Sequence, residues 1–481
     1  MNFKKIIFTL LVSSLLFACK KDLTETTTTT PPVVTNATVN TWIHQTMSNY
    51  YFWSTKMPAL SSTNVNIDPM KYFTSILYDY GNTDRFSWID SSSTDLIDGI
   101  NGFNKILGVK INAFLVDNAK PDGDIALVVA YVLKGSPAEK SGIKRGDIIL
   151  NVDGQTVNAR NYSTILQNET LTLGFGLFSN NTFNVIDKSL KLTKVELQTN
   201  PILIDTVINW SGKKVGYLAY SQFIGYVKNR LTGQEYNFDD SLRARFAGFK
   251  SKGVNELIVD LRYNGGGYVS SSNLLTNLMV KDIAARENNV MNKKVYNAAY
   301  TEYLTKQNDK TSFITKFQNE ANNIGNLSRV FILTSNSTAS ASELIINNLK
   351  PFMEVILVGE HTYGKNVGSF TITDEKKRWN YGLQPITFKI TNSLDQSDYG
   401  TVNGFLPTYE VNDNVLPYKL LGDPSETLLK AALNIIGPVA YKSNATLQSL
   451  KTTRKLAQPK AFSDNKNLDR QDMFEQPRGH Q

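Results

Sequence analysis

The sequence predicts an α/β protein built from several domains. Between residues 201 and 437, short apolar runs that suit buried strands alternate with longer stretches of helical periodicity, which is typical of a layered α/β core. Residues 104–200 combine short apolar runs with closely spaced turn signals, which predicts a small β-rich domain. Aromatic residues at three- and four-residue spacing in residues 39–103 predict a small helical domain whose aromatics form its core.

Composition and charge argue against a disordered, a nucleic-acid-binding or a metal-binding protein. The chain has 481 residues, of which 41% are hydrophobic, as in a globular protein rather than a disordered chain. Its net charge of +8 lies largely in the two ends, so we expect no nucleic-acid partner for the folded middle. Three scattered histidines and a single cysteine predict no metal site, and no cofactor is expected.

The start of the chain predicts export and membrane anchoring. Two lysines precede the apolar run Ile6–Phe17, which is too short to span a bilayer and suits a signal peptide. Its end resembles the lipobox at which bacterial lipoproteins are cleaved and lipidated, here on Cys19. We therefore expect a lipoprotein signal peptide at residues 1–19, a Thr/Pro-rich tether at 20–38 and a location in the cell envelope, on the periplasmic or outer-membrane side. A plain signal peptide with an incidental cysteine is the alternative.

The β-rich domain carries a possible peptide-binding motif. Residues 135–154 resemble the central part of a PDZ domain, and Leu107-Gly108-Val109 resembles the loop with which PDZ domains receive a peptide C-terminus. In such a loop, successive backbone N–H groups face the carboxylate and the peptide pairs with an open sheet edge. Gly108 lets the backbone approach closely. A β-rich domain that only packs is the alternative.

The core has four candidate buried strands, and the chain then becomes polar. Residues 438–481 show no sustained period and are expected to be a disordered basic tail. The candidate strands are Lys214–Tyr220, Glu256–Arg262, Arg329–Thr334 and Glu354–Gly359.

A candidate nucleophile follows the third of these strands. Ser340 and Glu343 form an S-x-x-E pattern, which by itself indicates a helix cap. The position also suits a nucleophile, because the hydroxyl stands at the positive end of the helix and the N–H of Ala341 can bind an oxyanion. The turn Gly265–Gly267 presents further backbone N–H groups with no side chain in the way, which suits the second half of an oxyanion hole.

The base is less obvious. Among the histidines only His361 lies near the core, so a Ser-His-Asp triad is hard to assemble. Lys365 is the alternative, because burial can lower the pKa of a lysine toward the working range. The stretch Gly359–Asn366 nearly matches a phosphate-binding P-loop, but Asn366 replaces the Mg²⁺-binding hydroxyl and a strand pattern follows, which excludes that interpretation.

Three segments together resemble the carboxy-terminal processing peptidases, relatives of the tail-specific and tricorn serine proteases. They are D-L-R-Y-N-G-G-G at residues 260–267, S-A-S-E at 340–343 and Y-G-K at 363–365. The resemblance implies a crotonase-like (ClpP/crotonase) protease core and an exported, lipid-anchored serine endopeptidase that acts on polypeptides near C-termini captured by the PDZ-like domain.

The resemblance also implies roles for individual residues. Ser340 would be the nucleophile and Lys365 the general base. The backbone N–H groups of Ala341 and of either Gly267 or Gly266 would bind the oxyanion. Two positions depart from the family pattern. Where many members have a glutamine that orients the lysine, this chain has Ser369, and where others have an aspartate it has Pro351. A lipid-anchored peptide-binding scaffold with a degenerate site, or a Ser340/His361 hydrolase, therefore remain as alternatives.

Overall fold

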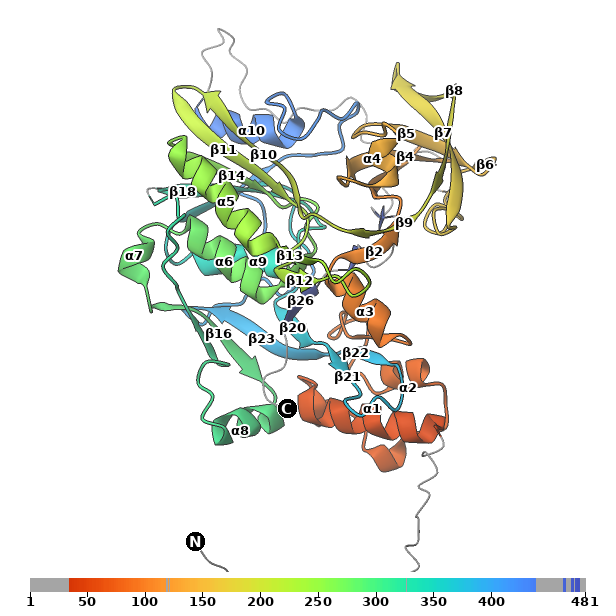
Figure 1. Ribbon diagram of the computed structural model, residues 1–481, viewed down its shortest axis with the longest axis vertical. Coiled ribbons are helices and arrows are strands. Elements are labelled where there is room, and N and C mark those ends of the chain that lie inside the picture. The colour runs from red at the N-terminus through yellow and green to blue at the C-terminus, as the bar shows by residue number, and fades with distance from the viewer. Residues whose placement is uncertain are drawn as a thin grey trace, which may run out of the picture.

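The computed structural model describes residues 34–437, apart from 118, 119, 121 and 326, together with 462–463, 469–470 and 472–475. The predicted signal peptide, Cys19 and most of the predicted tether lie outside the described residues. The N-terminal helices occupy one end of the molecule, and the β-rich domain lies beside the α/β core toward the other (Figure 1). Within the described ranges, no helix is both long enough and apolar enough to cross a bilayer.

The N-terminal domain is mostly helical. Its first helix begins at Asn36 because the Thr35 hydroxyl accepts a hydrogen bond from the N–H of Thr38, so three residues of the predicted tether are helical. Apolar side chains of α1 and α2 pack into one core, as their spacing predicts. Strand β1 pairs with a strand from much later in the chain, β22 (Gly382–Gln384), in a small three-stranded sheet. The elements are α1 (Asn36–Tyr50), η1 (Ser54–Lys56), η2 (Leu60–Ser62), α2 (Pro69–Ser75), β1 (Trp88–Asp90) and α3 (Ser93–Ile100).

The β-rich domain is an antiparallel sheet with one short helix. Its strand order is β25-β3-β4-β5-β7-β8, with β6 paired to β5, while β2 and β9 form a separate pair. The elements are β2 (Phe103–Ile106), β3 (Val109–Leu115), β4 (Ile125–Val132), α4 (Pro137–Lys140), β5 (Ile148–Val152), β6 (Gln155–Thr156), β7 (Thr170–Ser179), β8 (Thr182–Thr193), β9 (Val195–Gln198) and β25 (Phe462–Ser463).

The core is a sheet covered by helices on both faces, which confirms the predicted α/β class. Its strand order is β10-β11-β14-β18-β19-β24, and all neighbours except β10 and β11 pair in parallel. Helices α5, α6 and α9 pack on one face and α10 on the other. The four predicted strands are present as β11 (Lys213–Tyr220), β14 (Glu256–Asp260), β18 (Arg329–Thr334) and β19 (Glu354–Gly359). The other elements are β10 (Ile202–Trp210), β12 (Tyr226–Lys228), β13 (Glu235–Asn237), α5 (Phe238–Ser251), α6 (Val269–Met279), α9 (Ala341–Leu349), β24 (Tyr409–Glu410) and α10 (Thr427–Ile436).

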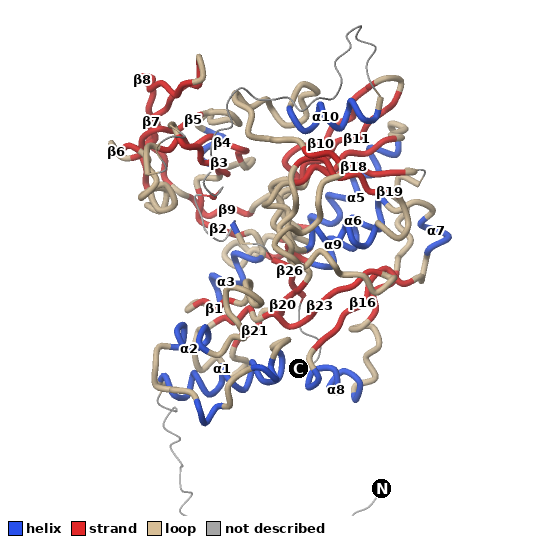
Figure 2. Tube along the Cα trace, turned by 180° about the vertical axis from the view of Figure 1, so that it is seen from behind, coloured by secondary structure: helices blue, strands red, loops and turns tan. Residues whose placement is uncertain are grey.

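A second, mixed sheet lies between the core helices and the N-terminal domain (Figures 1 and 2). Its strand order is β15-β26-β20-β23-β16-β17. The elements of this region are β15 (Gly266–Tyr268), α7 (Ile283–Arg286), β16 (Val290–Tyr296), α8 (Ala298–Lys306), β17 (Ile314–Lys316), β20 (Val367–Phe370), β21 (Ile372–Thr373), β22 (Gly382–Gln384), β23 (Ile386–Asn392) and β26 (Asp472–Glu475).

The prediction of a disordered tail is wrong for the described residues 462–463, 469–470 and 472–475, which we call the C-terminal segment. Strand β25 pairs with β3 of the β-rich domain, and β26 pairs with β15 and β20 of the second sheet. Met473 and Phe474 are buried there. Strands of two and four residues are too short to show a period in the sequence, and their partners are remote in the chain. The rest of 438–481 lies outside the described residues.

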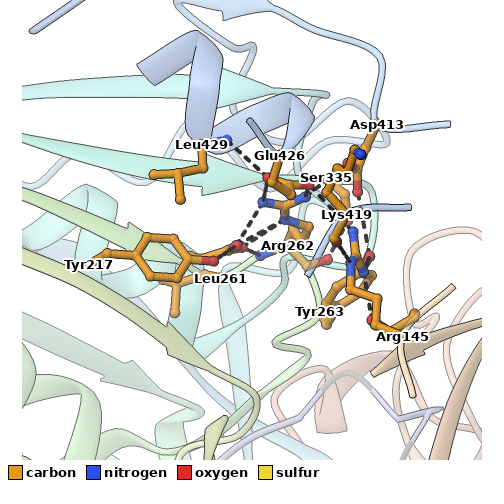
Figure 3. Close-up of polar contacts among 12 residues, drawn as sticks. Arg145, Tyr217, Leu261, Arg262, Tyr263, Ser335, Asp413, Lys419, Glu426 and Leu429 are labelled. Atoms are coloured by element: carbon orange, nitrogen blue, oxygen red, sulfur yellow. Dashed lines mark hydrogen bonds and ion pairs between the residues drawn. The ribbon is translucent and has the colours of Figure 1, made fainter. Parts of the chain in front are cut away.

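A buried ion-pair network joins the β-rich domain to the core (Figure 3). The Arg262 guanidinium contacts three carboxylates at 2.6–2.8 Å, those of Asp260, Asp413 and Glu426. Arg145, from the β-rich domain, reaches Glu426 at 3.4 Å. Burial raises the pKa of Asp413 to about 6 against the opposing effect of Arg262. Burial opposes ionisation of Glu426 too, but its bonds to Arg262 lower its pKa to about 2. Two guanidinium groups thus face three carboxylates in a largely buried network.

Candidate active site

Three predicted motifs converge at one edge of the core sheet. Strands β14, β18 and β19 are parallel neighbours, so the segments that follow them emerge side by side. These segments are the glycine turn, the Ser340 turn and the Lys365 turn. They are hydrogen-bonded to one another: the N–H of Ala339 donates to the Asn264 carbonyl at 3.1 Å, and the N–H of Tyr363 donates to the Thr338 carbonyl at 2.9 Å.

Ser340 adopts a strained backbone conformation at the start of α9. Its φ of 65° and ψ of −114° lie where side chains other than hydrogen are disfavoured, at a cost of roughly 1–3 kcal/mol. The side chain is fully buried, and its hydroxyl has no hydrogen-bond partner among the described residues. Sequence reasoning identified the S-x-x-E helix start but not this strain. A strained, unpartnered hydroxyl is more typical of a reactive group than of a helix cap.

Backbone N–H groups lie beside this turn. Ala341 is the first residue of α9, so its amide has no partner within the helix. Of the two glycines considered, Gly266 donates its N–H to the Asn264 side chain at 2.9 Å, and Gly267 pairs with Met473 of β26; we take Gly267 as the candidate oxyanion donor. Gly267 has a φ of 135°, and a Cβ on it would come within 2.2 Å of the Phe223 carbonyl oxygen. Only glycine fits here.

Lys365 lies in the turn after β19 and is 1% exposed. Its ammonium nitrogen is 4.9 Å from the ring centre of Phe86, which comes from the N-terminal domain. The neighbouring Arg85 donates a 2.9 Å hydrogen bond to the Gly364 carbonyl. Sequence reasoning assigned the aromatics of the N-terminal domain to its own core and missed this contact, because nothing local in the sequence links Phe86 to a residue almost three hundred positions later.

Glu343 connects the two candidate residues. One carboxylate oxygen accepts from the N–H of Ser340 at 2.7 Å and of Lys365 at 2.8 Å. The other accepts from the N–H of Gly364 at 2.7 Å and from the Thr362 hydroxyl at 2.5 Å. Burial raises the pKa of Glu343 to about 7, although these four donors favour the carboxylate. The sequence pattern contained Glu343, but only its capping role was considered.

The remaining candidates lie as follows. The His361 ring donates from Nδ1 to the Thr362 carbonyl at 2.9 Å and forms no hydrogen bond with Ser340. Ser369 lies on β20, where the Gln384 side chain donates to its hydroxyl at 2.9 Å, so a buried glutamine does reach this position from β22. Pro351 follows the C-terminal end of α9, the end away from Ser340.

The candidate peptide-binding loop, Leu107–Val109, precedes β3. Gly108 has a φ of 90°, and a Cβ there would lie 2.3 Å from that of Ser136. The edge of β3 next to this loop is covered by β25, whose Phe462 and Ser463 oppose Ile111 and Lys110. The pairing is antiparallel, so β25 runs toward the loop.

Comparison with known proteins agrees with this arrangement. Residues 214–399 match peptidase family S41, residues 38–88 match the peptidase S41 N-terminal domain and residues 128–174 match a PDZ domain. A crystal structure of a Bacteroides fragilis protein assigned to the S41 proteases superposes with a TM-score of 0.68 at 29% identity, covering 82% of this chain and 96% of that one.

Curated relatives are more distant. A chloroplastic C-terminal processing peptidase from Tetradesmus obliquus is 25% identical over 62% of this chain and 59% of its own length. A carboxyl-terminal-processing protease from Picosynechococcus is 25% identical over 66% of this chain and 68% of its own length. The match to the first thus spans under two thirds of that relative. With N-terminal, PDZ and peptidase domains in one chain, this protein belongs to peptidase family S41, the serine peptidases that include the carboxyl-terminal processing proteases.

Proposed function

We propose that this chain is a serine endopeptidase that cleaves polypeptides near their C-termini through a Ser340/Lys365 dyad on a crotonase-like core. The single observation that best supports the dyad is the Glu343 carboxylate, which binds the backbone N–H of both residues. This bond fixes the nucleophile turn relative to the lysine turn. The burial of both side chains supports the proposal further, because a lysine can act as a base only where water does not keep it protonated.

The proposed reaction runs through an ester intermediate. The Lys365 amine takes the proton of the Ser340 hydroxyl as its oxygen attacks the carbonyl carbon of the peptide bond. The N–H groups of Ala341 and Gly267 bind the resulting oxyanion. As the C–N bond breaks, the Lys365 ammonium returns the proton to the leaving amine. A water molecule then hydrolyses the acyl-enzyme, again giving its proton to Lys365, and restores the Ser340 hydroxyl.

The PDZ-like domain and the lipid anchor complete the proposal. Leu107, Gly108 and Val109 would hold the C-terminal segments of substrates next to the edge of β3, the edge with which β25 pairs in this structure. Cleavage and lipidation at Cys19 would place the enzyme in the cell envelope, where polypeptides of that compartment are its substrates. Mass spectrometry of the mature protein tests the anchor, since an N-terminal cysteine with a diacylglyceryl group on its sulfur is expected and an unmodified one would contradict it.

Substitution of the two residues tests the dyad. Ser340→Ala should lower kcat for cleavage of an unfolded polypeptide such as casein by about 10⁶-fold, as for other hydroxyl nucleophiles. Lys365→Ala should lower it by about 10²–10⁴-fold. Ser337→Ala and Lys376→Ala, at partly exposed and exposed positions, are matched controls and should leave kcat unchanged. Circular dichroism checks that each variant is folded. A kcat close to that of the wild type in either dyad variant would refute the assignment.

One observation favours a second function, a lipid-anchored peptide-binding scaffold. The Ser340 hydroxyl makes no hydrogen bond to Lys365 in this conformation. A scaffold would bind peptides but would cleave none in any variant, whereas the enzyme should lose cleavage and keep peptide binding when Ser340 is replaced.

A further inference from the structure

The C-terminal segment pairs with two parts of the molecule at which the proposed function places substrate. One is the edge of β3 beside the peptide-binding loop, and the other is the glycine turn of the candidate active site. In the second sheet, β26 lies between β15 and β20 and pairs in parallel with both. Met473 stands opposite Gly267, the candidate oxyanion donor, and Glu475 stands opposite Phe370. Strand β20 begins two residues after Lys365. The strand β26 thus fills a slot bounded by the glycine turn and by the strand that follows the lysine turn.

Two neighbouring side chains of β26 are buried on opposite faces of this sheet. Met473 is completely buried in an apolar cluster that includes Leu344, one helical turn after Ser340, and Val269 at the start of α6. Phe474 is 2% exposed and packs edge-on against Tyr268, with ring centres 4.4 Å apart. The Ser369 hydroxyl donates to the Met473 carbonyl at 3.3 Å. Backbone pairing with side chains in alternate pockets is the way in which proteins bind extended peptides by strand addition.

Two ion pairs and a cation–π contact join the segment to the rest of the molecule. Asp469 binds Lys110 of the β-rich domain at 2.6 Å, and Glu475 binds Lys294 of the second sheet at 2.5 Å. Arg470 lies over the Trp88 ring of the N-terminal domain, 3.2 Å from its centre, and also lines a pocket beside the glycine turn. In both ion pairs the lysine is buried and the carboxylate is partly exposed, so these contacts join the segment to the interior of the two domains.

We propose that the C-terminal segment is a pseudo-substrate, bound in cis along the track that a polypeptide substrate has to occupy. A polypeptide that pairs with β3 and then enters the slot between β15 and β20 competes with this segment for the same backbone groups. The site therefore works only after the segment has left. The inference rests on the proposed function in one respect, because that function places substrate beside Leu107–Val109 and at the N–H of Gly267, which β25 and β26 adjoin.

Binding of a free peptide tests the inference without catalysis. The probe is a fluorescent peptide with the sequence of residues 460–481, and the protein is the full chain carrying Ser340→Ala. The attached segment competes with the free peptide at an effective concentration of about 1 mM. With a dissociation constant of about 0.1 mM or tighter for the segment, this competition should weaken binding of the free peptide about 10-fold or more. Adding Met473→Asp and Phe474→Asp, which place carboxylates in the two apolar pockets, should release the segment and tighten peptide binding by that factor.

The control replaces two exposed leucines in the same way, Leu394→Asp and Leu406→Asp, which are 61% and 71% exposed. It should bind the peptide as weakly as the parent. Equal affinity in the released variant and the control, or no peptide binding by either, would overturn the inference. A loss of melting temperature in the released variant without a gain in peptide binding would show an ordinary structural strand and would overturn it as well.

Activity separates this inference from the proposed function. With Ser340 present, the released variant should cleave casein with a kcat/KM about 10-fold or more above that of the wild type. If no variant cleaves casein but the difference in peptide binding persists, the proposed function fails and the inference survives. If intact-mass measurement shows that the wild type removes its own C-terminal segment while Ser340→Ala keeps it, the segment is a true substrate and the pseudo-substrate proposal is wrong.

Discussion

Replacing Glu343 by glutamine should uncouple the nucleophile turn from the lysine turn. The carboxylate accepts four hydrogen bonds, two on each oxygen. A glutamine has the same shape, but its NH₂ group would face two donors in either orientation. Each buried donor left without an acceptor costs about 1–3 kcal/mol. We therefore expect the free energy of unfolding to fall by about 2–6 kcal/mol, and kcat for casein by about 100-fold with KM nearly unchanged, because the turns carry the reacting groups.

The pH dependence of stability gives a readout that a general loss of packing would not. Burial raises the pKa of Glu343 from 4.5 to about 7, so between these values the folded state binds a proton that the unfolded state has released. This contribution to stability is fully present below pH 4.5 and is lost as the pH rises through 7. From pH 5 to pH 8 the loss is about 2.5 kcal/mol. Glu343→Gln cannot titrate and should lack this loss.

The assay is urea unfolding at pH 5 and pH 8, with casein cleavage on the same samples. Thr362→Val is the matched control, since it removes one of the four donors and leaves the carboxylate in place. It should lower kcat by about 10-fold or less, and it should show a loss of stability between pH 5 and pH 8 at least as large as that of the wild type, because the lost hydrogen bond lowers the pKa of Glu343. If Glu343→Gln unfolds with the same pH dependence as the wild type and keeps kcat within twofold, the coupling role of Glu343 is refuted.

Three other substitutions test the surroundings of the site. Gly267→Ala should abolish cleavage in a protein that still folds, because its Cβ would lie 2.2 Å from the Phe223 carbonyl oxygen and displace the turn; unchanged kcat would contradict the oxyanion assignment. Arg85→Ala removes a charged hydrogen bond to the lysine turn and should lower kcat about 10-fold, while KM for casein stays constant. Arg262→Met leaves buried carboxylates without their cationic partner and should lower the free energy of unfolding by about 3–5 kcal/mol. The loss should be smaller at pH 5 than at pH 8, because the carboxylates can be protonated at pH 5. Equal losses at both pH values would argue against that cause.

Strong local patterns allowed much of this arrangement to be predicted from the sequence. Apolar runs predicted β18 and β19, and the residues that follow parallel neighbouring strands necessarily meet at one sheet edge. The sequence therefore predicts that the Ser340 and Lys365 turns lie close together. Glycine is required at residue 267 for steric reasons that the triple-glycine turn already suggested.

The rest depends on contacts between remote parts of the chain. The Phe86 ring reaches Lys365 from another domain, and Gln384 reaches Ser369 from a strand that is too short to recognise. Strand β26 looks like part of a polar tail because only two of its four residues, Met473 and Phe474, are apolar. The left-handed backbone of Ser340 left no trace in the sequence, because a serine before a helix is far more often an ordinary cap.

The most direct test of the central claim is covalent labelling of the full chain with a fluorophosphonate, followed by peptide mapping. The account predicts one adduct, on Ser340, which forms in the wild type and faster in the Met473→Asp, Phe474→Asp variant, and which forms at least 100-fold more slowly in Lys365→Ala. An adduct on any other serine, or equal labelling rates with and without Lys365, would contradict it.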